Sequence, residues 1–444
     1  MDPVDFIVVG GGISGLVAAT ALKANGRRVL LLEAGPRLGG MAWTYFNDMY
    51  ACEAGPGLLC LANPAAEEFL RNFGFLSTVN HVNRYASKRY VCQGGRAVEI
   101  PASLPGILKT GMISWGAKLA LFKEYSAERS FDPDETVAAF VQRRFGAECL
   151  EQAVDPLLRS VFFGEPEKLC AQHAIPWLWR IQNESGGIVC SILKRGVRSF
   201  FERKFINWTG GFSELVSGLD TTLKPDAQVG QPVESIRRID GGYEVRTQGG
   251  AYQSARVVVA TDAGTAGRLL SPLLSTAGDL QLISRASVAV VHLCFRRAAV
   301  KHDLEGMGLF IGRSQGLRTQ SVLFASSVRP GAAPAGHVLL SARVGGTRHA
   351  DVLQMKNEAL VKLVFQELMG PLQIHEGPVN YSVVRWPGSI PQYERDYDRV
   401  ETVCETVEKE CEGIHLLGNY RGGLWVDDCI GNAYLLAKRL MGAG

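Results

Sequence analysis

Hydrophobic residues follow three different patterns along the chain. Two uninterrupted apolar runs, Phe6–Val9 and Val29–Leu32, stand close to the beginning, and each has the length of a strand that is buried on both faces. Residues 104 to 205 repeat their apolar positions at helical spacing. Residues 286 to 400 alternate between apolar and polar positions, which is typical of an antiparallel sheet. These patterns predict an α/β protein with a helical part and a large antiparallel sheet.

The alternating patterns resolve into individual elements. A hairpin is predicted for residues 87 to 101, around a Gly-Gly turn. Between residues 233 and 261, two short hairpins lead into the buried strand Val257–Ala260, as a meander that returns to a nucleotide-binding sheet would. The other predicted elements are the helices Asp134–Phe145, Ser213–Leu223 and Lys356–Met369 and the strands Ser287–Arg296, Gly308–Ile311, Val322–Ser326, Val338–Val344 and Asn380–Arg385.

The first apolar run leads directly into a glycine-rich turn. Gly10, Gly12 and Gly15 form a G-x-G-x-x-G, which is followed by a stretch of helical composition, by the second apolar run and by Glu33. This order is that of a dinucleotide-binding unit. The first glycine permits a tight turn, the second lets a phosphate approach the backbone, and the third lets the helix lie close to the sheet. The helix N-terminus then faces the pyrophosphate, and Glu33 can accept hydrogen bonds from a ribose.

Composition and charge argue against several classes of protein. The net charge of +3 over 444 residues gives no reason to expect a nucleic-acid partner. The ten cysteines contain no C-x-x-C pair and no grouping with histidine at metal spacing, so we expect buried, reduced thiols and no metal. The eight histidines are scattered, and we find no Ser-His-Asp or Cys-His arrangement.

The N-terminal residues carry no targeting signal of the usual kind. They are acidic and lead straight into the first strand, so the protein is expected to be cytoplasmic. No run of about 18 apolar residues predicts a spanning helix. The apolar segment Leu104–Phe122, which includes Lys109 and Lys118, can lie peripherally on a membrane surface, line an apolar substrate cavity or pack in the core. The sequence leaves the oligomeric state open.

The residues after Glu33 distinguish between nicotinamide and flavin cofactors. The run continues through Ala34, Arg37, Gly39 and Gly40, and a nicotinamide-binding unit needs no second glycine pair here. The Glu-x-x-x-Arg-x-Gly-Gly pattern resembles the flavin-containing amine oxidase superfamily. This resemblance implies FAD as the cofactor, with the arginine and the glycine pair lying along its pyrophosphate and flavin.

A second glycine-rich signature lies near the C-terminus. The strand predicted at Ile414–Leu417 ends at Gly418, and the chain then passes Gly422 into a terminal helix that includes Val426. The N-terminus of that helix can stabilise the negative charge that reduced flavin carries at N1 and O2. The predicted FAD-binding part is therefore discontinuous and consists of residues 1–60, 207–275 and 412–444.

The whole chain resembles the protoporphyrinogen oxidase family within this superfamily. The runs that carry the resemblance are Glu53–Pro56, Phe163–Leu169, Arg385–Tyr393, Gly418–Asn419 and Asp428–Ile430. The Trp-Pro-x-x-Ile-Pro-Gln-Tyr of the third run is the most discriminating. The resemblance implies an FAD-binding, Rossmann-type (two-dinucleotide-fold) domain with an inserted antiparallel-sheet domain for substrate, at residues 61–103 and 280–411, and a helical subdomain at 104–206.

The resemblance also implies which residues contact the cofactor. They are Gly10, Gly12, Ile13, Ser14, Gly15, Glu33, Ala34, Arg37, Gly39, Gly40, Met41, Gly55, Pro56, Val233, Thr261, Trp386, Gly418, Asn419, Trp425 and Val426.

The activity that the resemblance implies is porphyrinogen oxidation in haem or tetrapyrrole biosynthesis. A methylene bridge of protoporphyrinogen IX or coproporphyrinogen III gives a hydride to flavin N5, and O2 reoxidises the flavin. The substrate loses its N–H protons readily, so no catalytic base is expected. Apolar walls and a cationic clamp suit a flat tetrapyrrole with propionates. Arg89, Gln93 and Trp425 are the implied substrate contacts, with Lys88 and Arg96 nearby.

Two positions depart from the family pattern. Gly57 stands where several members have Asn or Asp, and Trp425 stands where a small residue is usual. Two alternatives therefore remain. The first is an FAD-dependent amine oxidase or desaturase that acts on an amine or a secondary metabolite. The second is a flavin-binding scaffold whose cavity Trp425 closes.

Overall fold

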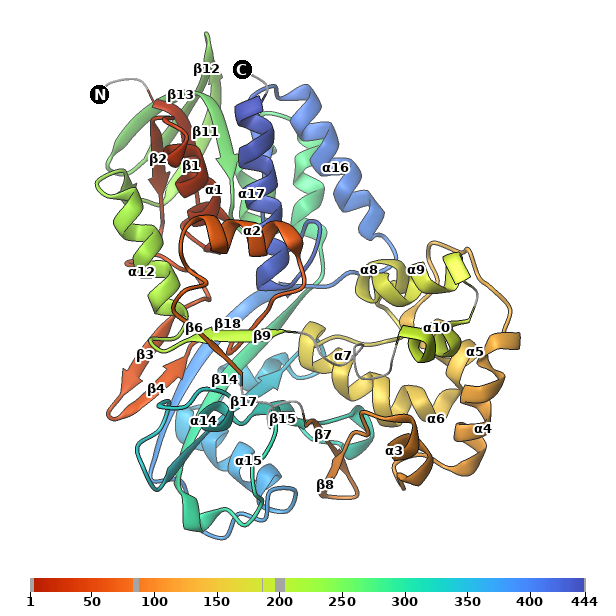
Figure 1. Cartoon of the computed structure of the whole chain (residues 1–444). Coiled ribbons are helices and arrows are strands. Elements are labelled where there is room, and N and C mark those ends of the chain that lie inside the picture. Colours follow the sequence, from red (N-terminus) through yellow and green to blue (C-terminus); the bar gives the residue numbers. More distant parts are fainter. Residues whose placement is uncertain (1–3, 83–87, 186, 196–203, 443–444) are drawn as a thin grey trace.

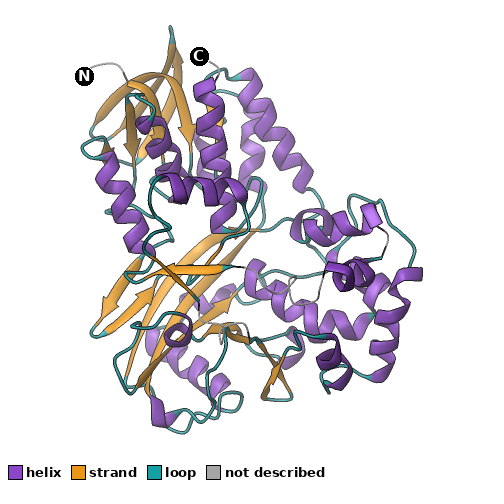
Figure 2. Ribbon diagram, viewed as in Figure 1, coloured by secondary structure: helices purple, strands orange, loops and turns teal. Residues whose placement is uncertain are grey.

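The computed structural model describes residues 4–82, 88–185, 187–195 and 204–442. Two seven-stranded sheets lie one above the other in Figure 1, and a group of helices stands beside the lower one. Figure 2 shows that this group contains almost no strand. The predicted α/β class, with a helical part and a separate antiparallel sheet, is confirmed.

The upper sheet is built around a parallel unit. β1 (Val4–Val9) pairs with β2 (Val29–Leu32) and with β13 (Gly250–Val259), and β13 also pairs with β19 (Ile414–Leu416). The central residues of these strands are buried and apolar, as strands covered on both faces must be. The remaining strands are β10 (Ala227–Gln228) beside β2, and β11 (Val233–Ile239) and β12 (Gly242–Thr247), which form the predicted meander with β13.

Helices cover both faces of this sheet. On one face, α1 packs between α12 and α17 and shares a hydrophobic core with them (Figure 1). The helices of this face are α1 (Ile13–Ala24), α2 (Pro64–Asn72), α12 (Phe212–Leu223) and α17 (Val426–Gly442). The opposite face is covered by α13 (Ala263–Leu270) and α16 (Tyr397–Glu410).

Two of these helices, α2 and α16, come from ranges that the sequence assigns to the substrate domain. The carboxylate of Asp427 in α17 accepts hydrogen bonds from the backbone N–H groups of Ala62 and Asn63, both at 3.0 Å, and so fixes the beginning of α2. We propose that α2 and α16 belong to the FAD-binding part. The sequence-based domain boundaries otherwise stay predictions.

The lower sheet has the strand order β18-β14-β17-β16-β15-β7-β8. Its strands are β7 (Tyr90–Gln93), β8 (Arg96–Glu99), β14 (Arg285–Arg296), β15 (Gly308–Phe310), β16 (Thr319–Leu323), β17 (His337–Gly345) and β18 (Asn380–Pro391). All neighbours are antiparallel except β15 and β7. α15 (Asn357–Met369) packs on one face. The hairpin β7–β8 forms as predicted, and it extends this sheet.

Three elements differ from their predicted bounds by three or more residues. The strand predicted at Val322–Ser326 is β16, which spans Thr319–Leu323, and Ala325 and Ser326 begin the short helix α14 (Ala325–Val328) instead. β18 was expected to end at Arg385 but continues through Trp386 and Pro387. Proline cannot donate a hydrogen bond to a neighbouring strand. It is tolerated because β18 lies at the edge of the sheet and, in the described part of the chain, pairs with β14 alone. α5 (Val137–Phe145) begins later than predicted because the hydroxyl of Thr136 caps it.

The helical part contains a strongly apolar exposed face. On α4 (Trp115–Lys123), the side chains of Trp115, Leu119 and Phe122 are 68%, 60% and 53% exposed. Their spacing of four and three residues places them on one side of the helix. The other helices of this part are α3 (Leu104–Lys109), α6 (Ala147–Cys149), α7 (Asp155–Phe162), α8 (Ala171–Ala174), α9 (Pro176–Ser185) and α10 (Ile188–Arg195). Among the described residues, no helix has both the length and the apolar character needed to cross a membrane.

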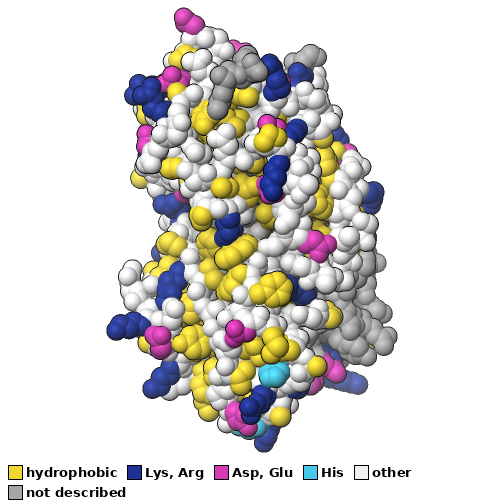
Figure 3. Space-filling view, turned by 90° about the vertical axis from the view of Figure 1, so that its left-hand side faces the viewer, with side chains coloured by type: hydrophobic (Ala, Val, Ile, Leu, Met, Phe, Trp, Pro, Cys, Tyr) yellow, Lys and Arg dark blue, Asp and Glu magenta, His cyan; other side chains and the backbone are white. Residues whose placement is uncertain are grey.

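Two small sheets that the sequence did not predict connect the larger ones. They consist of β3 (Thr44–Asn47) with β4 (Tyr50–Glu53), and of β5 (Leu59–Cys60), β9 (Phe205–Trp208) and β6 (Val79–His81). The β3–β4 turn leaves Phe46 and Met49 75% and 67% exposed. Hydrophobic side chains gather at mid-height on this side of the molecule (Figure 3). Strand β4, which follows this turn, carries Glu53 into the interior.

Candidate active site

The glycine-rich turn between β1 and α1 packs as tightly as its sequence requires. Gly10 has a φ of 105°, which favours glycine. A Cβ atom on Gly15 would lie 1.9 Å from the carbonyl oxygen of Gly10, so this position admits no side chain. A Cβ atom on Gly12 would meet nothing within 4 Å. The turn therefore leaves open space at Gly12, in front of the N-terminus of α1.

Glu33 lies at the end of β2 and is held beside this turn. Its two carboxylate oxygens accept hydrogen bonds from the backbone N–H groups of Gly11 at 2.6 Å and Gly35 at 2.7 Å. Each oxygen keeps a further lone pair for a ribose hydroxyl. The N–H groups of Gln231 and Gly230 donate to the carbonyl oxygens of Glu33 and Gly35, both at 2.8 Å, and this brings the start of β11, with Val233, close to the strand end.

The second glycine pair lies against the first turn. The N–H of Gly39 donates to the carbonyl oxygen of Gly11 at 2.8 Å, and a Cβ atom on Gly40 would lie 3.3 Å from the Cα atom of Gly12. The guanidinium of Arg37 donates to the carbonyl oxygen of Gly40 at 3.0 Å and lies 4.0 Å from the ring of Trp43. The two glycine segments thus form one continuous backbone surface.

The later parts of the chain reach the same region. Thr261, which follows β13, lies close to Gly10, and a Cβ atom on Gly10 would be 3.3 Å from its methyl group. The carbonyl oxygen of Thr261 would in turn be 3.0 Å from a Cβ atom on Gly418. Trp425 immediately precedes α17 and is 39% exposed. The predicted residues of the N-terminal, middle and C-terminal segments are therefore brought together.

The segment after β4 continues this surface toward the lower sheet. A Cβ atom on Gly55 would lie 2.7 Å from the carbonyl oxygen of Met41. The indole N–H of Trp386 donates to the carbonyl oxygen of Ala54 at 2.6 Å, and the side-chain amide of Asn419 donates to the carbonyl oxygen of Ser389 at 3.0 Å.

An open glycine turn, a helix N-terminus and an acid at the neighbouring strand end fit a dinucleotide such as FAD.

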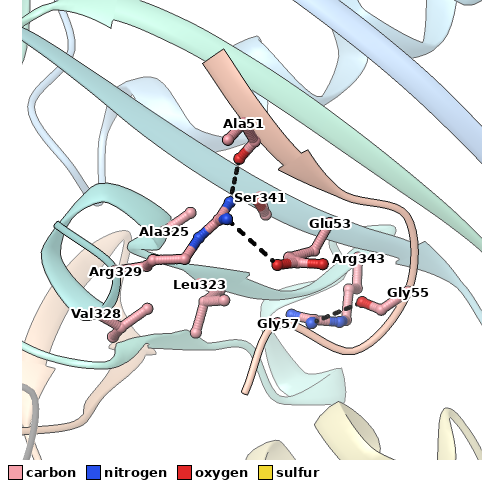
Figure 4. Close-up of a pocket in the computed structure, with 10 residues that line it drawn as sticks. All are labelled: Ala51, Glu53, Gly55, Gly57, Leu323, Ala325, Val328, Arg329, Ser341 and Arg343. Carbon is pink, nitrogen blue, oxygen red and sulfur yellow. Dashed lines mark hydrogen bonds and ion pairs between the residues drawn. The ribbon is translucent and has the colours of Figure 1, made fainter. Parts of the chain in front are cut away.

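A buried polar cluster adjoins this segment. Glu53 forms an ion pair of 3.5 Å with Arg329, which also donates to the carbonyl oxygen of Ala51 (Figure 4). The hydroxyl of Thr44 donates to the other carboxylate oxygen at 2.8 Å. Burial raises the pKa of the Glu53 carboxyl to about 7, against the opposite effect of the Arg329 guanidinium. Arg343 lies at the other end of the same cavity, beside Gly55.

His292 lies next to this cluster and is unsuited to act as a base. Its Nε2 donates to the carbonyl oxygen of Glu53 at 3.1 Å, which leaves Nδ1 to accept from the hydroxyl of Ser341 at 2.9 Å. Burial, together with the Arg343 guanidinium, lowers the pKa of the imidazole to about 3. The ring is therefore neutral and has both nitrogens occupied.

The family model for flavin-containing amine oxidoreductases matches residues 13–441. The chain belongs to this family. It is accordingly an FAD-dependent oxidoreductase, and the predictions of FAD and of an oxidoreductase are confirmed. In this chain, the residues of the glycine turn and the neighbouring Glu33 would hold the cofactor.

The curated relatives of this chain include porphyrinogen oxidases, which align with almost its full length. It is 24% identical to coproporphyrinogen III oxidase of Bacillus subtilis over 449 residues, which cover 96% of this chain and 95% of that protein. It is 28% identical to the chloroplastic protoporphyrinogen oxidase of Oryza sativa subsp. japonica over 489 residues, which cover 98% and 88%. The resemblance to the protoporphyrinogen oxidase family is thereby confirmed.

Solved structures agree on the fold. A protein from Exiguobacterium sp. 255-15, named "Putative protoporphyrinogen oxidase", matches with a TM-score of 0.86 and 22% identity over 100% of both chains. Putrescine oxidase, in its complex with putrescine, matches with a TM-score of 0.72 and 16% identity over 99% of both chains. Proteins of different names therefore share this fold.

The predicted substrate residues of the β7–β8 hairpin lie at the far end of the lower sheet from β18, which carries Trp386. The side-chain amide of Gln93 donates to the carbonyl oxygen of Met112 and to the amide oxygen of Gln152, both at 3.0 Å. Lys88 forms an ion pair of 3.1 Å with Glu305, and Arg96 is exposed. Arg89 lies 5.9 Å from the ring of Phe205.

Sequence reasoning missed the polar residues under the Glu53–Gly57 segment. Arg343 and His292 stand inside strands that were predicted correctly, each between apolar neighbours. A charged or ionisable residue inside an otherwise apolar strand is the signal that would have identified them.

The first prediction concerns the ribose. A Glu33→Ala variant should bind FAD more weakly by about 1.5–3 kcal/mol, because a partly buried hydroxyl pair loses its charged acceptor. Reconstitution of the apoprotein, followed by flavin fluorescence, measures this dissociation constant. Glu33→Gln is the control, since it keeps one acceptor and should lose less. Equal FAD affinity in all three proteins would show that Glu33 does not bind the ribose.

Proposed function

We propose that this protein is an oxygen-dependent porphyrinogen oxidase that acts on protoporphyrinogen IX or coproporphyrinogen III. The support comes from the relatives: this chain aligns over most of its length with a bacterial and a plant porphyrinogen oxidase, at 24% and 28% identity. Bound FAD supplies the chemistry, accepting a hydride and transferring electrons to O2. Each turnover with O2 removes two hydrogen atoms from the substrate and yields H2O2, so three turnovers convert a porphyrinogen into a porphyrin.

The protein's own residues would bind and orient the substrate. Porphyrinogens lose their pyrrole N–H protons readily, so no group has to act as a strong base. This agrees with a neutral His292 that has both ring nitrogens hydrogen-bonded and with a Glu53 carboxyl that is paired with Arg329. The N-terminus of α17 would stabilise the negative charge of the reduced cofactor.

Anaerobic reduction of the bound flavin tests the proposal directly. The purified FAD-loaded protein is mixed with protoporphyrinogen IX, coproporphyrinogen III, putrescine or a polyene, and loss of the oxidised flavin absorbance is followed. We expect rapid bleaching by one or both porphyrinogens and none by putrescine. Bleaching by the amine or the polyene alone would replace the proposal by the amine oxidase or desaturase alternative. A flavin that no compound bleaches would favour the scaffold.

A cationic clamp on the β7–β8 hairpin remains part of this proposal. Arg89→Ala is expected to raise the apparent Michaelis constant for the substrate. The corresponding loss of binding free energy is about 1–3 kcal/mol, because a partly desolvated substrate carboxylate loses its partner. The flavin spectrum should not change. Arg96→Ala, which alters an exposed side chain of β8, should change the constant by less than twofold. Equal constants for the two variants would remove Arg89 from the substrate site.

We also propose peripheral membrane contact through the exposed face of α4. Trp115, Leu119 and Phe122 are suited to insertion among lipid head groups, and Lys123 can approach anionic lipids. Sedimentation with anionic phosphatidylserine vesicles should capture the wild type. A variant with Trp115→Ser and Phe122→Ser should remain in the supernatant while retaining FAD. Equal capture of both proteins would contradict this contact.

A further inference from the structure

Arg343 occupies an unusual position in the middle of the lower sheet. It lies on β17 between Val290 of β14 and Ser321 of β16. Residues on a strand alternate between its two faces. The neighbours Ala342 and Val344 accordingly belong to the apolar core under α15, and Arg343 projects from the other face, toward Gly55 and Gly57.

The guanidinium of Arg343 has far more hydrogen-bonding capacity than the protein uses. Its one hydrogen bond in the described residues is donated to the carbonyl oxygen of Gly55, at 3.2 Å, and it forms no ion pair with any described carboxylate. An arginine carries five N–H donors. Burial lowers its pKa to about 10, so the side chain is still charged at neutral pH. Arg343 is only partly buried, so its unused N–H groups are open to a ligand, and an anion is the partner that suits them.

The nearest acid does not supply that anion. Glu53 faces Arg329 and Thr44, as Figure 4 shows for Arg329, and its carboxyl has a pKa of about 7. Two guanidinium groups thus share the neighbourhood of one carboxyl group that is only partly ionised at neutral pH. The cluster keeps a positive charge of at least one.

The space beside Arg343 exists because residue 57 is glycine. A Cβ atom there would lie 2.3 Å from a methyl carbon of Leu323 and 3.6 Å from a guanidinium nitrogen of Arg343. The resulting cavity is small, about 10 Å³, which is room for one group of the size of a water molecule. One oxygen atom of a carboxylate fits it, and the rest of that group would lie at the cavity mouth, whereas no ring fits. Its polar lining comes from Glu53, Arg329, Ser341 and Arg343 (Figure 4).

The cavity is separated from the glycine surface by a single chain segment. Gly55 packs on Met41, which follows the second glycine pair, and its carbonyl oxygen accepts the hydrogen bond from Arg343. A group held at Arg343 therefore lies one chain segment away from the glycine surface.

We propose that Arg343 binds a carboxylate group of the substrate and so acts as a second anion site, distinct from the β7–β8 hairpin. This rests on the proposed function, since a porphyrinogen supplies the carboxylate as a propionate. The planar guanidinium offers two parallel N–H groups to such a carboxylate. The absence of a side chain at Gly57 makes room for it, so that this departure from the family pattern and Arg343 form one specificity element.

The experiment compares a charged ligand with its neutral analogue. Binding of coproporphyrin III and of coproporphyrin III tetramethyl ester to the FAD-loaded protein is measured by quenching of tryptophan fluorescence. We expect Arg343→Met to weaken binding of the acid by 10- to 100-fold and to leave binding of the ester within threefold. Arg296→Met is the matched control, because Arg296 is exposed at the end of β14, and it should bind both ligands as the wild type does.

Each outcome decides a separate point. If the wild type oxidises a porphyrinogen and Arg343→Met binds the acid as tightly as before, Arg343 is not an anion site and the proposed function stands. If the wild type binds neither ligand and oxidises no porphyrinogen, the proposed function fails. If Arg343→Met loses FAD itself, the guanidinium serves the cofactor and the inference is wrong.

A second variant covers the case in which Arg343→Met does not fold. Arg343→Lys keeps the positive charge but loses the paired N–H groups, and it should weaken binding of the acid by roughly 5- to 10-fold. Sodium propionate and propionamide provide a further comparison. Propionate should raise the unfolding temperature of the wild type more than propionamide does, and this difference should shrink in Arg343→Lys. Equal effects of the two compounds on the wild type would overturn the proposal.

Discussion

A Gly12→Ala variant is expected to fold as the wild type does and to bind FAD roughly 100-fold more weakly, a loss of about 2.8 kcal/mol. The added methyl group would meet no protein atom within 4 Å, so the apoprotein has no reason to rearrange. The same methyl group would occupy the space that a pyrophosphate needs at the N-terminus of α1. The measurements are the FAD dissociation constant by reconstitution and the unfolding temperature of the apoprotein.

Gly15→Ala provides the contrasting case. Its Cβ atom would lie 1.9 Å from the carbonyl oxygen of Gly10, and neither backbone segment can move without separating α1 from the sheet. We expect the apoprotein itself to lose more than about 3 kcal/mol of stability, as overpacking against backbone does in severe cases. The prediction is contradicted if both variants lose FAD affinity and apoprotein stability in the same proportion.

The second large effect concerns Glu53 and pH. The folded protein holds the proton of this carboxyl to about pH 7, whereas an exposed glutamate in the unfolded chain releases it near pH 4.5. Between these values the folded state binds more protons, so the free energy of unfolding falls as pH rises. The stabilisation is fully present below pH 4.5 and is lost as pH passes 7. Its size is roughly 3 kcal/mol.

Glu53→Gln removes this titration and keeps the shape of the side chain. Relative to the variant, the wild type should therefore lose about 2–3 kcal/mol of stability between pH 5 and pH 8. Urea unfolding of both proteins at pH 5, 6, 7 and 8, followed by fluorescence, gives the difference at each pH. Two curves that stay parallel over this range would mean that Glu53 is ionised in the folded protein throughout.

The large elements of the fold could be predicted because their sequence patterns are local. A parallel strand buried on both faces has to be apolar throughout, as β1 and β2 are, and an antiparallel strand such as β14 alternates or becomes continuously apolar. The glycine turn could be predicted for the same reason, since its glycines and Glu33 obey a fixed spacing. FAD and the oxidoreductase class followed from that spacing together with the family resemblance.

The short elements and the contacts within the polar cluster could not be predicted because they join segments that are distant in the sequence. β5 has two residues, and it exists because β9, about 145 residues later, pairs with it. The bond between Arg343 and the carbonyl oxygen of Gly55 spans 288 residues. Neither partner's neighbours in sequence indicate the other. The extension of β18 through Pro387 likewise depends on its place at the edge of the sheet.

The parallel sheet also has a consequence for the order in which the protein can be made. β19 joins β13 only after residues 414–416 have been synthesised, and α17, which packs against α1, follows it. Until α17 has been made, a growing chain has the glycine turn without this covering helix. The turn itself is encoded near the start of the chain, whereas the strand and helix that close around it come more than 400 residues later, so FAD binding depends on contacts between segments made at very different times.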